Sequence, residues 1–170
     1  PEDFNAIPFI NADGYHSKTI AYSIWHIFRI EDIVAHTVIT EDEQVFFTGN
    51  YQVRINSPII TTGNELVKQQ IADFSKQLNL EELYSYIFEV RESTEKILER
   101  FSYDELKWKI PDERKGYLKS LNVVNCDEKA IWLIDYWCSK DIRGLIQMPF
   151  SRHWIMHTEA CLRIKNKMHS

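Results

Sequence analysis

Apolar residues recur at intervals of three and four along most of the chain, the spacing of a helix with a buried face. The longest such stretch covers residues 17–40, where Ser17 is placed to cap the first turn. Its apolar positions form a wide stripe, made up of Ile20, Ile24, Trp25, Ile27, Phe28, Ile30, Ile33, Val34, Val38 and Ile39. A stripe of this width predicts a helix that is buried on more than one side.

Further helix starts are marked by capping boxes, in which a polar residue stands three positions before a glutamate: Asn79 with Glu82, Ser102 with Glu105, and Asn125 with Glu128. The first box opens the clearest amphipathic helix of the chain, which continues to about Phe101. The second predicts a short helix that stops before Pro111, and the third a helix that frays near Gly144.

Two other segments show the helical pattern. One covers residues 64–78, and the other covers residues 151–167, after Pro149, which is expected to break the chain. Residues 1–17 lack regular spacing and are expected to be irregular.

Residues 41–63 change character, with an acidic run followed by scattered glycine, asparagine and proline. We interpret them as a long connection with one short helix near its start. The β-branched runs at 45–47 and 59–62 are the only strand candidates. The sequence therefore predicts an all-α fold, a four-helix bundle forming a single domain over residues 1–170, with a long connection after the first histidine-bearing helix.

Composition narrows the function classes. Lysine and arginine number 20 against 25 acidic residues, giving a net charge of −5, which argues against nucleic acid as the main partner. The apolar content of 44% excludes a disordered chain. The odd number of cysteines, without a C-x-x-C pair, favours reduced thiols and a cytoplasmic protein. No signal peptide and no apolar run of roughly 18 residues is seen, so we expect no membrane partner.

The strongest candidate chemistry is the pair His153 and His157. Residues four apart share one helix face about 6 Å apart, close enough for two imidazoles to bind one metal ion. Such a pair is a weak signal by itself, and many pairs on surface helices have no role. Trp154 replaces the glutamate of a zinc-protease motif, so that activity is excluded.

His26 strengthens this hypothesis because it lies within the most apolar helix. A lone buried histidine is usually satisfied by a backbone carbonyl, but helical bundles also build metal sites from facing side chains. Three imidazoles with open positions are the usual layout of a catalytic metal site rather than a structural one.

The other histidines are weaker candidates. His36 lies about 80° around the helix from His26 and should face elsewhere, most simply in an exposed pair with Asp32. His16 falls in the irregular opening, and His169 falls at the end of the chain. Cys138 and Cys161 are expected to be buried and inert.

Arg29, Arg152 and Trp25 are the candidates for substrate binding, because they are near the histidines in the sequence. The alternative is that both arginines are solvated or paired with Glu31 and Glu159, and that Trp25 belongs to the core.

The segments around the histidines, Ser23–Asp32 and Phe150–His157, resemble those of the DinB-like superfamily. The resemblance implies a four-helix bundle in which His26, His153 and His157 bind a divalent metal, commonly zinc or nickel. Members with an assigned activity are metal-dependent transferases that use a low-molecular-weight thiol such as bacillithiol, mycothiol or glutathione.

The chain departs from that pattern at its start. The family usually has a helix before its first histidine-bearing helix, and the chain begins at Pro1 without methionine. We expect either that this helix precedes Pro1 in the natural protein, or that residues 64–78 complete the core.

The resemblance thus implies a metal-dependent thiol transferase with a small-molecule substrate, and we expect that the chain could form a homodimer. A thiol cosubstrate would need an anion-binding group beside the metal, a role for which Arg29 and Arg152 are the candidates. Two alternatives stay open: a non-catalytic helical binding or stress-response protein, and a metal-dependent hydrolase at the same site.

Overall fold

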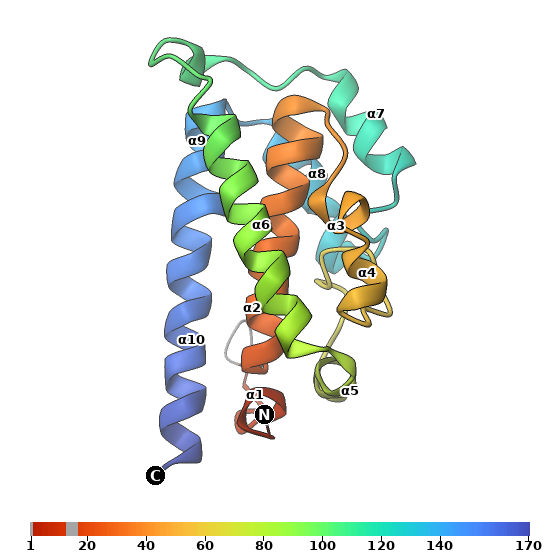
Figure 1. Ribbon diagram of the computed structural model, residues 1–170, viewed down its shortest axis with the longest axis vertical. Helices are drawn as coiled ribbons and strands as arrows, with labels where there is room; N and C mark the ends of the chain where they lie inside the picture. The colour runs from red at the N-terminus through yellow and green to blue at the C-terminus, as the bar shows by residue number, and fades with distance from the viewer. Residues whose placement is uncertain (1, 13–16) are drawn as a thin grey trace.

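The computed structural model describes residues 2–12 and 17–170, and in these ranges the chain is helical with no strand (Figure 1). The helices are α1 (Glu2–Asn5), α2 (Ile20–Asp32), η2 (Ile33–Thr40), α3 (Val45–Thr48), α4 (Tyr51–Arg54), α5 (Gln69–Gln77), α6 (Leu80–Leu98), η3 (Glu105–Lys107), α7 (Glu113–Ser120), α8 (Glu128–Cys138), α9 (Ile142–Gln147), η4 (Met148–Arg152) and α10 (His153–Met168). The expected all-α fold is confirmed. Among the described helices, none combines the length and the apolar character needed to cross a membrane.

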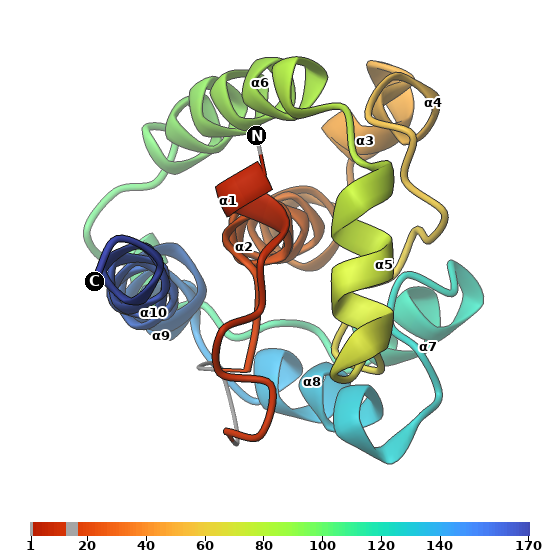
Figure 2. The same cartoon turned by 90° about the horizontal axis from the view of Figure 1, so that it is seen from below.

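Helix α2 lies in the middle of the molecule, with α5, α6, α8 and α10 around it (Figure 2). It continues directly into the π-helical segment η2, and every residue from Ile20 to Val38 except Ile24 is buried. The wide apolar stripe therefore predicted the burial correctly. The start was predicted two residues early, because Thr19 rather than Ser17 caps the helix by accepting the Tyr22 amide.

Burial of α2 places an ion pair, Arg29 and Asp32, in the core at 3.4 Å. Asp32 accepts the backbone amides of Val45 and Phe46 at 2.9 Å and the Tyr86 hydroxyl at 2.8 Å. It thereby satisfies two free amides at the start of α3. The buried carboxylate thus fixes both the connection after η2 and helix α6 to the central helix.

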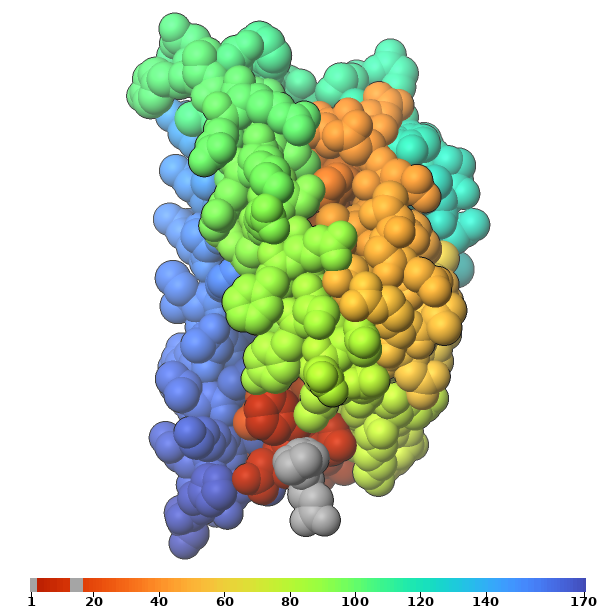
Figure 3. All heavy atoms as spheres, in the orientation of Figure 1, coloured from red at the N-terminus to blue at the C-terminus, as the bar shows by residue number. Residues whose placement is uncertain are grey.

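The connection over residues 41–63 contains two short helices, α3 and α4, where one was expected. Both strand candidates are wrong: residues 45–47 lie in α3, and residues 59–62 have no regular structure. The apolar side chains Val45 and Phe46 pack inward on α2, which a helical turn achieves as well as a strand. In Figure 3 this connection and α6 cover the face of the molecule in front of α2.

The remaining helices follow the capping signals with small shifts. Asn79 caps α6 as predicted, accepting the amides of Glu81 and Glu82. Asp127 rather than Asn125 caps α8, which ends at Cys138, before the predicted fraying point near Gly144. Helix α7 was not predicted, since its sequence has little apolar periodicity.

Two further segments differ from their expected form. Residues 64–68 are not helical, and the helix predicted over 64–78 starts only at Gln69; this helix, α5, packs on α2. Pro149 does not break the chain, because it sits in the first turn of η4, where a missing amide costs no helical hydrogen bond. The short helix α1 also interrupts the opening that was expected to be irregular.

Replacing Asp32 should destabilise the fold strongly. Asp32→Ala leaves the buried guanidinium of Arg29 without its counter-charge, which typically costs about 3–5 kcal/mol of the free energy of unfolding. Urea unfolding followed by far-UV circular dichroism measures this. Asp135→Ala is the matched control, since Asp135 pairs with Lys115 on the surface. Similar midpoints for the two variants would contradict the assigned role.

Candidate metal centre

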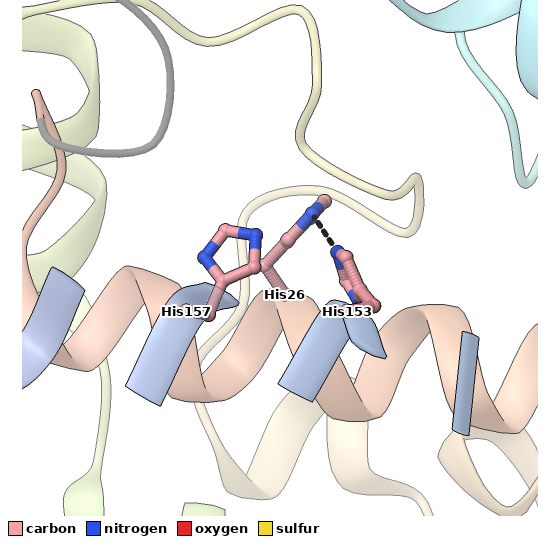
Figure 4. A group of neighbouring side chains, drawn as sticks. All are labelled: His26, His153 and His157. Carbon is pink, nitrogen blue, oxygen red and sulfur yellow. Dashed lines mark hydrogen bonds between the residues drawn. The ribbon is translucent and has the colours of Figure 1, made fainter. Parts of the chain in front are cut away.

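Three imidazoles converge from two helices (Figure 4). His26 comes from α2, and His153 and His157 come from successive turns of α10. The Nε2 atoms of His26 and His153 are 3.2 Å apart, and one ligand nitrogen from each of the three residues falls within 4.8 Å of the others. The structure therefore brings together the three residues that the sequence and the resemblance selected.

The ring of His26 is held by a backbone carbonyl 36 residues away in the sequence. Its Nδ1 lies 2.6 Å from the carbonyl oxygen of Thr62, so Nδ1–H donates and the Nε2 lone pair faces the other histidines. A hydrogen bond of this kind fixes the tautomer and the direction of a metal-ligating histidine.

Gly63, the residue after Thr62, lets the turn pack closely against the Trp25 ring of α2. Gly63 has a φ of +78°, and a Cβ atom there would lie 2.8 Å from the Trp25 ring. Its carbonyl accepts the Tyr22 hydroxyl at 2.8 Å, and the Tyr22 ring stacks on His26 at 5.4 Å. The turn at residues 62–63 thus orients His26 directly and through Tyr22.

The two histidines of α10 follow a π-helical turn. Segment η4 runs from Met148 to Arg152, immediately before His153, and joins α9 to α10 without an interruption of the chain. Such turns inside helices are frequent at functional sites, because they rotate the following side chains relative to the preceding helix.

Burial keeps the three imidazoles neutral. It lowers the pKa of His153 to about 4 and of His157 to about 3, and it lowers that of His26 well below the usual value. Repulsion among the imidazolium forms lowers the pKa of His26 and His157 further, and the ammonium group of Lys18 acts in the same direction. Neutral imidazole is the form that binds a metal ion.

The donor set fits a divalent transition metal. Zinc–nitrogen bonds of about 2.05 Å at tetrahedral angles place two ligand nitrogens about 3.3 Å apart, close to the 3.2 Å between His26 and His153. The same distance also suits a hydrogen bond from one imidazole to the other.

The histidines line a cavity of about 630 Å³. Three helix faces and one turn form its walls: Lys18, Tyr22, His26 and Ile30 beside α2; Lys129, Trp132, Leu133, Tyr136 and Trp137 on α8; His153, Met156 and His157 on α10; and Asn64, Leu66, Val67 and Lys68 before α5. Ala12, Ser17, Met148 and Pro149 complete the lining. The site is therefore a concave, largely apolar pocket with imidazoles at one wall.

The three residues expected to bind substrate do not line this cavity. Arg29 is fully buried, donates to the Ile60 carbonyl and the Gln44 side chain, and lies 4.1 Å from the centre of the Phe46 ring. Trp25 packs in the core against Phe74, and Arg152 is exposed. The alternative ion pairs of these two arginines with Glu31 and Glu159 do not form either. Glu31 pairs with Arg91, and Glu159 pairs with Arg163.

The other histidines lie elsewhere, as expected, with one correction. His36 does pair with Asp32, at 3.8 Å, but the pair is buried, and the Ser93 hydroxyl lies 3.0 Å from the His36 ring. His169 is exposed near Asp3, and His16 falls outside the described residues. Cys138 is buried as predicted and Cys161 partly so.

Comparison with protein-family models, curated proteins and solved structures finds no match to the chain.

Sequence reasoning missed the cavity residues Lys18, Tyr22, Lys68 and Lys129, and the carbonyl of Thr62. A signal for the first two was present, because residues 18, 22, 26 and 30 repeat at four and all line the cavity. Lys68 and Thr62 carry no such signal, since they reach the site through the turns of a long connection.

The protein should bind about one divalent ion per chain through its three histidines. Protein purified without a His-tag, incubated with zinc or nickel and freed of excess ion, is measured by inductively coupled plasma mass spectrometry. His157→Ala should lose the ion, while His169→Ala, at an exposed position, should retain it. A parent protein that holds no metal after this treatment would rule out the site.

Below about pH 6.5, the metal-free protein should lose stability. The unfolded chain takes up protons on these imidazoles near their usual pKa of 6.5, whereas the folded protein keeps His153 and His157 neutral to about pH 4 or lower. The unfolded state therefore binds more protons, and the free energy of unfolding falls by up to about 1.4 kcal/mol per histidine between pH 7.5 and 5.5.

Urea unfolding of chelator-treated protein at these two pH values measures the loss. His157→Gln, which cannot titrate, should reduce the loss by about 1.4 kcal/mol relative to the parent. An equal loss in both proteins would show that His157 is not held neutral by the fold.

Proposed function

We propose that the protein is a DinB-like, metal-dependent transferase that uses a low-molecular-weight thiol, with zinc or nickel bound by His26, His153 and His157. The observation that carries this proposal is the convergence of three imidazoles at the wall of a cavity large enough for a small-molecule substrate. In this proposal α2, α6, α8 and α10 correspond to the four helices of the DinB-like bundle, and the three free cysteines agree with a reducing, cytoplasmic location.

A divalent ion bound at this site would lower the pKa of a thiol or water that it coordinates. The residues of the chain contribute the surroundings. The Thr62 carbonyl holds His26 with Nε2 toward the site, and side chains of α8 form an apolar part of the cavity wall. Three protein ligands leave coordination positions open, which a structural four-ligand site would not.

The reaction class is the transfer of an electrophilic carbon to a thiol. A carbon–sulfur bond forms, the bond between that carbon and its leaving group breaks, and the leaving group departs with the electron pair. The thiol proton is released to solvent, so the reaction needs no oxidant or reductant.

Thiol transfer should be measurable with a chromophoric electrophile. Protein loaded with zinc or nickel is mixed with 1-chloro-2,4-dinitrobenzene and, in turn, glutathione, mycothiol and bacillithiol. With one of the thiols, conjugation should exceed the rate without protein by at least about tenfold. His157→Ala should abolish the excess rate, and His169→Ala should preserve it.

The same proteins distinguish the alternatives. If metal-loaded protein conjugates none of the thiols but hydrolyses 4-nitrophenyl acetate in a His157-dependent manner, the site is that of a hydrolase. If it does neither while binding metal, the transferase proposal is wrong and a binding role is favoured.

A further inference from the structure

The charged groups that line the cavity, apart from the histidines, are all cationic among the described residues. They are Lys18, Lys68 and Lys129, and no described aspartate or glutamate is part of the lining. This is a marked segregation in a chain whose net charge is −5. A cavity lined by one sign of charge attracts ligands of the opposite sign, because low-dielectric walls concentrate its field.

None of these three lysines pairs with a carboxylate of the described residues. The lysines with such partners are Lys96, Lys107 and Lys115, all outside the cavity. The ammonium group of Lys18 lies 5.0 Å from the centre of the Tyr22 ring, near the histidines. It is partly buried, and no carboxylate of the described residues pairs with it, so an anionic ligand would compensate its charge.

The backbone of Lys68 supplies an independent indication. Its φ of 46° and ψ of −116° lie in a region that glycine adopts freely and that strains a residue with a side chain. Strained residues of this kind concentrate at functional sites. A lysine at a position suited to glycine, with its side chain lining the cavity, indicates that the side chain has a role there.

Aromatic side chains beside these lysines bear on the rest of the ligand. Tyr22, Trp132, Tyr136 and Trp137 line the same cavity, whose volume of about 630 Å³ accepts a molecule of drug-like size. Aromatic side chains bury flat apolar groups well, through stacked and edge-on contacts.

We propose that this cavity binds an amphipathic organic acid, whose carboxylate lies among Lys18, Lys68 and Lys129 and whose flat apolar body packs on the aromatic wall. The inference rests on the proposed function for what happens at the histidines, and it names the class of substrate presented there. Recognition of the carboxylate by the lysines does not itself require a metal ion. The anion-binding groups of the site are therefore lysines, in place of the arginines expected from the sequence.

The test compares two probes that differ only in charge: 2-naphthoate and its neutral isostere 2-naphthamide. Binding to chelator-treated protein is measured by isothermal titration calorimetry at low and high salt. At low salt 2-naphthoate should bind about tenfold more tightly than 2-naphthamide, and salt should reduce this preference because it screens the lysines. Equal affinities, or binding of neither probe, would overturn the proposal.

Variants assign the preference to the lysines. Lys18→Met and Lys68→Gly should each reduce the preference for 2-naphthoate about threefold or more, while Lys165→Met, at an exposed position outside the cavity, should keep it. Because Lys68→Gly also removes backbone strain, its thermal midpoint should not fall below that of the parent. A preference unchanged in both cavity variants would overturn the proposal.

Repeating the titration with metal-loaded protein separates this proposal from the proposed function. If the lysine-dependent preference holds in metal-free protein but metal-loaded protein has no transferase activity, the binding site stands and the transferase assignment fails. If the preference appears only with metal present and survives both lysine substitutions, the metal rather than the lysines binds the acid, and this proposal fails alone.

Discussion

The burial of α2 on all sides is the constraint on which the rest of the structure depends. A helix so enclosed must find partners for its polar side chains within the protein, because an unpaired buried charge or hydrogen-bonding group is costly. Together with its cap residue and η2, the helix carries many buried polar groups: Thr19, Ser23, His26, Arg29, Glu31, Asp32, His36 and Thr37. Segments distant in the sequence supply hydrogen-bond and ion-pair partners for these groups, and these partners determine which segments cover the helix.

The long connection after η2 supplies the largest share of these partners, and in doing so it builds part of the site. Arg29 holds the Ile60 carbonyl at 2.6 Å, and two residues further the Thr62 carbonyl holds His26. Arg29, which the sequence predicted to bind substrate, thus helps to hold the fold together. The Ile60 and Thr62 carbonyls belong to one short stretch of backbone, so His26 is oriented by the same segment that binds the buried Arg29 side chain.

Burial also sets the chemical state of the histidines. Imidazoles that cannot readily take up protons are ready to bind a metal ion at neutral pH, and the same burial makes the metal-free protein lose stability in acid. The cavity beside them combines an aromatic wall with lysines that have no carboxylate partners among the described residues.

The sequence by itself determined what local interactions encode: the helical class, the cap at Asn79 and the spacing that places His153 and His157 on one face. These features depend on residues within about four positions of one another. Tertiary structure decided the contacts over long separations, such as the 127 residues between His26 and His153 and the placement of Lys68 through a long connection. Periodicity shows which face of a helix is buried but not which partner covers it, since many partners satisfy the same apolar face equally well.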